Sequence, residues 1–201
     1  MLPAFAEAVR ATTQPCTLLL LIPPLAMAVI TKGRWAPFVA TCIGAILGGW
    51  LFIANVVALS AAQLQLSGGL VAVTIGLVAA APTVPQLAAA ATPSAETGAA
   101  GGVAFVATLW WRPCVGVELG AILSGARAGL VGQLSGITAY MLGALVPVLA
   151  AVLLMRAIEP SDNNARRASW VAGGVGIATA AALAIGRHDE LVTSLTRWST
   201  S

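Results

Sequence analysis

Long apolar runs separated by short polar stretches dominate the chain. The runs are unbroken and do not alternate with a period of two, so helices are expected and strands are not. Each run reaches about 18–25 residues, the length of a helix that crosses a bilayer. The pattern predicts an all-α, polytopic membrane protein with six transmembrane helices, at residues 1–30, 35–59, 70–91, 102–126, 130–155 and 168–186.

Polar stretches divide these helices into two groups of three. Residues 92–101, with Pro93, Glu96 and Gly98, form the clearest linker. We therefore expect one membrane domain over residues 1–201, with a first repeat at 1–91 and a second at 102–201. Shorter connections are expected at 31–34 and 127–129, with a loop at 60–69 and the longest polar stretch at 156–167.

The first helix carries prolines at Pro15 and at Pro23-Pro24, which predict a kink or a break. A secretory signal peptide cleaved near residues 25–28 is the alternative for this segment. Two features disfavour it: the proline pair interrupts the apolar core, and Glu7 does not suit the basic start of a signal.

Composition agrees with membrane embedding. The chain is 59% hydrophobic and 8% charged, whereas soluble domains are about 25% charged. A net charge of +3 is too small and scattered to indicate nucleic acid binding. Five basic residues follow the first and fifth helices, against four on the other side, which favours extracytoplasmic termini in a bacterial-type inner membrane. The five are Lys32, Arg34, Arg156, Arg166 and Arg167, and the four are Arg10, Arg127, Arg187 and Arg197.

Two features of the second helix concern packing. Gly44 and Gly48 form a GxxxG step, which lets helices approach closely. Cys42 is interpreted as a small buried thiol without a chemical role. The chain has three cysteines and one histidine, His188 in the tail. Because a metal site needs three or four ligands, no metal is predicted.

Two Pro-Cys pairs, Pro15-Cys16 and Pro113-Cys114, occupy the first helix of each group of three. An odd number of helices per group makes the two groups inverted repeats, and inverted repeats place functional sites where broken helices meet near the midplane. Each repeat would then deliver one cysteine to the same place. The alternative is that the two dipeptides coincide by chance in a proline-rich chain.

The dipeptide suits thiol chemistry. Proline fits best in the first turn of a helix, so the following cysteine lies at the positive end of the helix dipole, which favours the reactive thiolate. Arg112 adds positive charge beside Cys114, and burial acts in the opposite direction. Arg112 and Glu118 are costly inside a membrane. They are interpreted either as groups that stabilise thiolate and move protons, or as a structural ion pair supported by Gln14.

These residues resemble the CcdA family and the transmembrane domain of DsbD. The matching stretches are Gln14-Pro15-Cys16-Thr17-Leu18 and, more specifically, Arg112-Pro113-Cys114-Val115-Gly116 with the apolar residues that follow. The resemblance covers the whole chain, since the family has six helices in two inverted halves. Leu19 and Val117 depart from it, because many relatives carry proline there, and relatives usually have uncharged residues at Arg112 and Glu118.

The resemblance implies a transmembrane thiol–disulfide oxidoreductase without metal, flavin or haem. Cys16 and Cys114 would be its redox pair. Such a carrier takes reducing equivalents from cytosolic thioredoxin and passes them to extracytoplasmic thioredoxin-like proteins, often for cytochrome c maturation. Three alternatives remain: a small-solute or proton-coupled transporter using Arg112 and Glu118, a quinone-linked disulfide oxidase, and a structural subunit. The oxidase is disfavoured because it needs a further exposed thiol pair.

Overall fold

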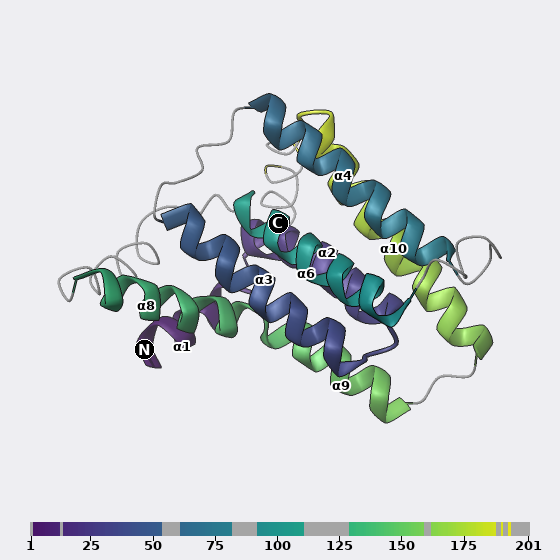
Figure 1. The fold of residues 1–201 in the computed structure, drawn as a ribbon, viewed down its shortest axis with the longest axis horizontal. Coiled ribbons are helices and arrows are strands. Elements are labelled where there is room, and N and C mark those ends of the chain that lie inside the picture. The colour runs from purple at the N-terminus through teal and green to yellow at the C-terminus, as the bar shows by residue number, and fades with distance from the viewer. Residues whose placement is uncertain are drawn as a thin grey trace.

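The computed structural model describes residues 2–12, 14–53, 61–81, 92–110, 129–158, 162–187, 190 and 193. All regular structure in these residues is helical, which confirms the predicted all-α class (Figure 1). The helices are α1 (Leu2–Ala11), α2 (Pro15–Ile30), α3 (Trp35–Ile53), α4 (Ala61–Ala80), α6 (Pro93–Leu109), α8 (Gly129–Ala144), α9 (Val146–Ile158) and α10 (Asp162–Ala184).

Helix length in the described residues falls short of the expected spans. No single described helix is both long and apolar enough to cross a membrane. Helices α8 and α9 meet that standard together, with a bend of 40° between them. The bend falls at Leu145, directly before the first turn of α9, which contains Pro147. Proline fits the first turn of a helix because its missing N–H would have no partner there. A new helix, α9, therefore starts at Val146, and the fifth predicted helix is two segments.

Three expected connections are helical over most of their described residues. Residues 61–69, expected as a loop, are the start of α4, because alanine, leucine and glutamine form helices readily and no proline interrupts them. Residues 93–101 of the expected linker are likewise helical and form the first half of α6. There Thr92 accepts a hydrogen bond from the Ala95 amide at 3.2 Å, and Pro93 occupies the first turn. Likewise, α10 begins at Asp162, inside the polar stretch expected at 156–167.

The first predicted helix breaks at one of its two proline sites. It is interrupted between Ala11 and Pro15, as the sequence predicted. Pro23 and Pro24, in contrast, lie inside α2, which continues through them to Ile30. The segment is therefore a ten-residue and a sixteen-residue helix joined by a short connection.

Glycines set the closest helix contacts. A Cβ on Gly48 would lie 2.7 Å from the carbonyl oxygen of Phe105, and one on Gly44 would overlap the carbonyl oxygen of Gly101. These contacts confirm the GxxxG step as a close-approach site, and they show that α3 and α6 run parallel. A Cβ on Gly143 would likewise lie 2.6 Å from the carbonyl oxygen of Phe5 in α1.

The remaining contacts give the helix directions. Gly68 meets Ala180 and Gly173 meets Ala79, so α4 and α10 are antiparallel. Helix α10 also packs antiparallel on α2, since Gly173 lies near Ile30 and Gly176 near Ala26. The helices therefore alternate in direction along the chain, with α2, α4 and α8–α9 opposed to α3, α6 and α10.

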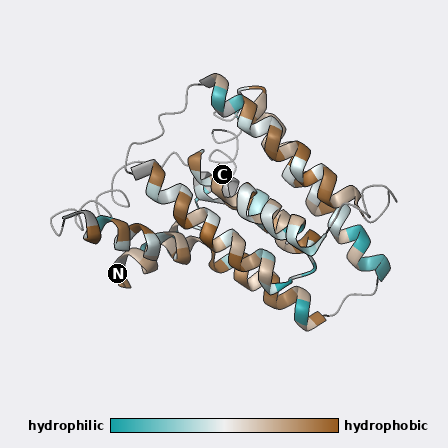
Figure 2. Cartoon of the chain, in the orientation of Figure 1, coloured by the Kyte–Doolittle hydropathy of each residue, from teal (hydrophilic) through white to brown (hydrophobic). Residues whose placement is uncertain are grey.

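Many large apolar side chains face outward. The buried hydrophobic residues are about half alanine and about half larger side chains such as Tyr140 and Ile137. Figure 2 shows that hydrophobic residues recur along the helices. Exposed large apolar residues follow three of them and are listed by helix: Trp35, Val39, Ile43 and Leu47 on α3, Leu66, Leu70, Val73 and Leu77 on α4, and Trp170, Val171 and Val175 on α10. Water-soluble proteins rarely expose apolar patches of this size.

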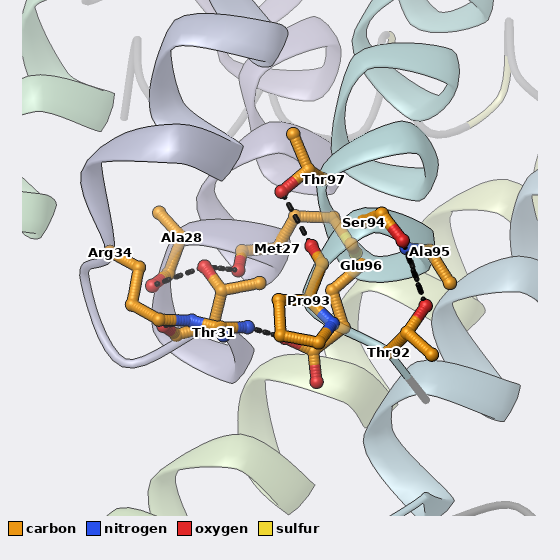
Figure 3. A network of polar contacts seen from close by, with 10 residues as sticks. All are labelled: Met27, Ala28, Thr31, Arg34, Thr92, Pro93, Ser94, Ala95, Glu96 and Thr97. Atoms are coloured by element: carbon orange, nitrogen blue, oxygen red, sulfur yellow. Dashed lines mark hydrogen bonds and ion pairs between the residues drawn. The ribbon is translucent and has the colours of Figure 1, made fainter. Parts of the chain in front are cut away.

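Charged side chains make contacts between several helices at one end of the helix bundle. The Arg34 side chain forms an ion pair with Glu96 in the first turn of α6 (Figure 3). Lys32 Nζ lies 3.6 Å from Asp162 Oδ1, at the start of α10. The Arg156 guanidinium lies 5.6 Å from the ring centroid of Trp35. We call this the basic end. It joins the connection between α2 and α3 to α6, α9 and α10.

The Arg34–Glu96 pair predicts a measurable coupling. The side chains are 44% and 23% exposed, so solvent screens the pair only in part. We expect Arg34→Gln and Glu96→Gln to destabilise the protein, with a coupling energy of about 1 kcal/mol in a double-mutant cycle. Thermal unfolding in detergent at low and high salt would measure it. Additive effects of the two substitutions would contradict a direct pairing.

Candidate functional site

Cys16 lies in the first turn of α2. Gln14 is the residue before the helix, with extended backbone angles of φ −81° and ψ 140°, and its side chain makes no capping hydrogen bond. Pro15 opens the helix, so the predicted restart of the helix at the Pro-Cys pair is confirmed. The amides of a first turn point toward the helix start and favour negative charge there. The side chains of Pro15 and Cys16 lie outside the described part of the structure.

Helices α2 and α6 pack against each other in opposite directions. The connection that follows α2 reaches the first turn of α6 through the Arg34–Glu96 pair. Further along, Leu21 of α2 and Thr108 of α6 line the same cavity. The start of α2 is therefore at the same end of this helix pair as the last turn of α6, on the side away from the basic end.

A small apolar cavity lies among α2, α3, α6 and α8, and it reaches Leu21, in the second turn of α2, and Thr108, in the last turn of α6. Leu21 comes five residues after Cys16, and Thr108 comes six residues before Cys114. The hydroxyl of Thr108 donates to the carbonyl of Ala104 at 2.8 Å, so the wall is almost wholly apolar. The lining residues are Leu21, Pro24, Ala45, Ala104, Ala107, Thr108, Met141, Ala144 and Leu145.

Trp110 fixes the end of α6. Its side chain is 6% exposed, and its indole N–H donates to the Ser67 hydroxyl of α4 at 2.8 Å. The described chain stops here, four residues before Cys114. Sequence analysis missed this anchor, because nothing in the local pattern pairs a tryptophan with a serine 43 residues away.

Of the other predicted site residues, some lie outside the described part of the structure and one lies inside it. Arg112, Pro113, Cys114 and Glu118 lie outside the described residues. Gln14 is half-buried at the start of α2. The structure thus describes the backbone at Cys16 and, on the side of Cys114, the chain as far as Trp110.

Cys42 belongs to the packing of α3. Its thiol is free and half-buried, beside an apolar cluster that includes Leu145 and Val148. Within the described ranges, no three histidine, cysteine or acidic side chains gather in a way that could hold a metal ion.

The Trp110–Ser67 bond gives a second stability prediction. Trp110→Phe keeps most of the buried ring and removes the donor, so we expect a loss of about 1 kcal/mol in the free energy of unfolding. In a Ser67→Ala background the same substitution should cost less, because the acceptor is already gone. Denaturant unfolding in detergent would measure both. An equal cost in the two backgrounds would show that ring packing alone accounts for the loss.

Comparison with known proteins leaves the family open: no family model matches the chain, and neither the curated proteins nor the solved structures give a match.

Proposed function

We propose that this chain is a membrane-embedded thiol–disulfide oxidoreductase of the CcdA type, with Cys16 and Cys114 as its redox pair. The observation that carries the proposal is the antiparallel contact of α2 and α6. It brings the helix start at Pro15-Cys16 to the same end as the chain that leads from Trp110 toward Cys114. Four residues of chain cover at most about 14 Å, which is short compared with the length of either helix.

The outer surface supports membrane embedding. Stripes of leucine, valine and isoleucine face outward from α3, α4 and α10, whereas glycines form the closest contacts between helices and alanines make up about half of the buried hydrophobic residues. Membrane bundles have this arrangement, because lipid solvates large apolar side chains and small residues allow close helix packing. Six spans in a bacterial-type inner membrane are proposed on this basis, with α1–α2 and α8–α9 as two broken spans.

Helix pairing supports the inverted repeat. Exchanging the halves converts the first span into the fourth, the second into the fifth and the third into the sixth. The contact between the first and fifth spans (α1–α2 with α8–α9) then corresponds to the contact between the fourth and second spans (α6 with α3), and both contacts are present. Similarly, the contact of α2 with α10 becomes that of α6 with α4. The alternating helix directions fit the same exchange.

The proposed cycle consists of two thiol–disulfide exchanges. A thiolate of cytosolic thioredoxin attacks the Cys16–Cys114 disulfide. That bond breaks, a mixed disulfide forms, and the released cysteine takes up a proton. The second thioredoxin thiol then attacks the mixed disulfide, which leaves oxidised thioredoxin and a carrier dithiol. The dithiol reduces the disulfide of an extracytoplasmic thioredoxin-fold protein by the same steps, so two electrons cross the membrane per cycle.

Local charge supports the chemistry proposed for each cysteine. The first turn of α2 stabilises a Cys16 thiolate through its free amides. Arg112 is proposed to do the same for Cys114, and Glu118 to receive or supply the proton. Glutamine at either position should then slow the exchange and leave the pair able to form a disulfide.

Trapping tests the proposal directly. Cys16→Ala and Cys114→Ala would each be made in a Cys42→Ala background, so that one thiol remains. The remaining thiol would be activated with an aromatic disulfide reagent and mixed with thioredoxin that lacks its resolving cysteine. We expect each variant to give a mixed disulfide on a non-reducing gel.

The matched control keeps only Cys42, in a Cys16→Ala/Cys114→Ala variant, and should trap nothing. Alkylation of the otherwise native chain should also show a reducible Cys16–Cys114 disulfide. If neither single-thiol variant traps thioredoxin and no such disulfide forms, the carrier function is wrong. Retention of solute uptake without either cysteine would instead identify a transporter.

A further inference from the structure

We propose that the basic end binds the phosphate groups of anionic phospholipids, through Arg166, Arg167, Arg156 and Lys32. This inference rests on the membrane embedding in the proposed function and is independent of the thiol chemistry.

The four cations are exposed and are held near one another by contacts between helices. The Lys32 side chain is 62% exposed, and its contact with Asp162 brings it to the first turn of α10. Arg166 and Arg167 follow one turn later on that helix and are also exposed. Arg156, at the end of α9, is exposed beside Trp35. Three separate chain segments therefore contribute positive charge to one surface, where Figure 2 shows hydrophilic colour on α9 and α10.

Acidic side chains do not balance this surface within the described ranges. Glu96 is occupied by Arg34. Among the described residues that leaves Asp162 against four cations. Glu159, in the connection between α9 and α10, lies outside the described residues; counting it by sequence, the surplus is 4 − 2 = 2 positive charges. At the other end the described arginines each have an acidic neighbour one helical turn away. Arg10 lies 3.5 Å from Glu7, and Arg187 lies 2.9 Å from Glu190. Among the described residues, the unbalanced positive charge therefore lies at the basic end.

Two tryptophans join the charged surface to the apolar one. Trp35 is 44% exposed in the first turn of α3, and Trp170 is 50% exposed one turn after Arg166 on α10. Indole rings favour the headgroup level of a bilayer. Beyond them along the same helices come the exposed apolar stripes, with Val39 after Trp35 and Val175 after Trp170.

The order on α10 is thus cation, indole and aliphatic surface, and at α3 it is the same, with Arg156 of α9 as the cation beside Trp35. A phospholipid presents the same order as phosphate, interface and acyl chain. A free phosphate ion would need only the cations, and an acidic protein would not need the apolar surface that continues below them. The indole and aliphatic layers favour a lipid headgroup as the occupant.

Lipid retention tests the inference on the full-length protein. The chain would be reconstituted in vesicles of equal phosphatidylglycerol and phosphatidylcholine, extracted in mild detergent, and its retained lipids measured by mass spectrometry. We expect several-fold enrichment of phosphatidylglycerol. Arg166→Gln/Arg167→Gln should lose most of this enrichment, and Arg166→Lys/Arg167→Lys should keep it. The matched control Arg10→Gln/Arg187→Gln removes the same charge at the other end and should retain lipid like the unmodified chain.

Three results would overturn the inference. Equal phosphatidylglycerol retention by the Gln pair and the control pair would show that these arginines do not select lipid. Displacement of the lipid by millimolar inorganic phosphate would indicate a phosphate ion site. Failure of the unmodified chain to enter vesicles would overturn membrane embedding as well, whereas loss of selectivity in a chain that enters normally would leave the proposed function standing.

Discussion

Cys16→Ser and Cys114→Ser should each abolish electron transfer across the membrane, and the double variant should be no worse than either single one. One thiol cannot form the intramolecular disulfide that accepts two electrons, so loss of either sulfur removes the carrier state completely. Residues that act as a unit are non-additive in this way. Cys42→Ser should keep full activity, because Cys42 lies half-buried in the packing of α3.

Proteoliposomes give the measurement. Reduced thioredoxin with its reductase would be enclosed on one side, and a disulfide-bonded thioredoxin-fold acceptor placed on the other. Acceptor reduction would be followed by alkylation and a gel shift. Half activity in each single variant would indicate two independent thiols, and activity in the double variant would exclude a cysteine carrier. Equal folding of all variants, checked by thermal unfolding, is the control.

The sequence predicted helices well where they are apolar and failed at their ends. The stretches at 61–69 and 92–101 are polar or glycine-rich, which resembles loop composition. Their helical state depends on good helix formers, on the Thr92 cap, and on packing: Gly68 contacts Ala180, and Gly101 contacts Ala40. Contacts of that kind depend on residues far away in the chain, so local composition could not reveal them.

At the candidate site, local features were predictable and pairings between helices were not. Pro15 marks a helix start by its own chemistry, and α2 begins there. The Arg34–Glu96 pair joins residues 62 positions apart, and Trp110 meets Ser67 across 43. The chain offers several acidic residues to Arg34 and many hydroxyls to Trp110, so only the fold determines which of them becomes the partner. The first contact holds the start of α6 beside the end of α2, and the second holds the end of α6 against α4.

Gly44→Leu should be the most destabilising of the glycine substitutions at the contact between α3 and α6. A side chain at Gly44 would meet the backbone of Gly101, whose Cα would lie 3.2 Å from the new Cβ. Backbone cannot rotate away as a flexible side chain can, so the two helices must separate. Overpacking of a core costs about 1–3 kcal/mol, and we expect the upper part of that range here. A drop of several degrees in the midpoint of thermal unfolding would report it.

Gly102→Leu is the matched control, one residue from Gly101 on the same helix. Among the described residues, nothing lies within 4 Å of a Cβ at Gly102. Leucine forms helices better than glycine by roughly 0.5–1 kcal/mol, so this variant should be neutral or more stable. The contrast separates close packing from helix propensity, since both variants replace a helical glycine with leucine. If both lose stability equally, the close contact between α3 and α6 is wrong, and the placement of α6, on which its antiparallel contact with α2 depends, loses its support.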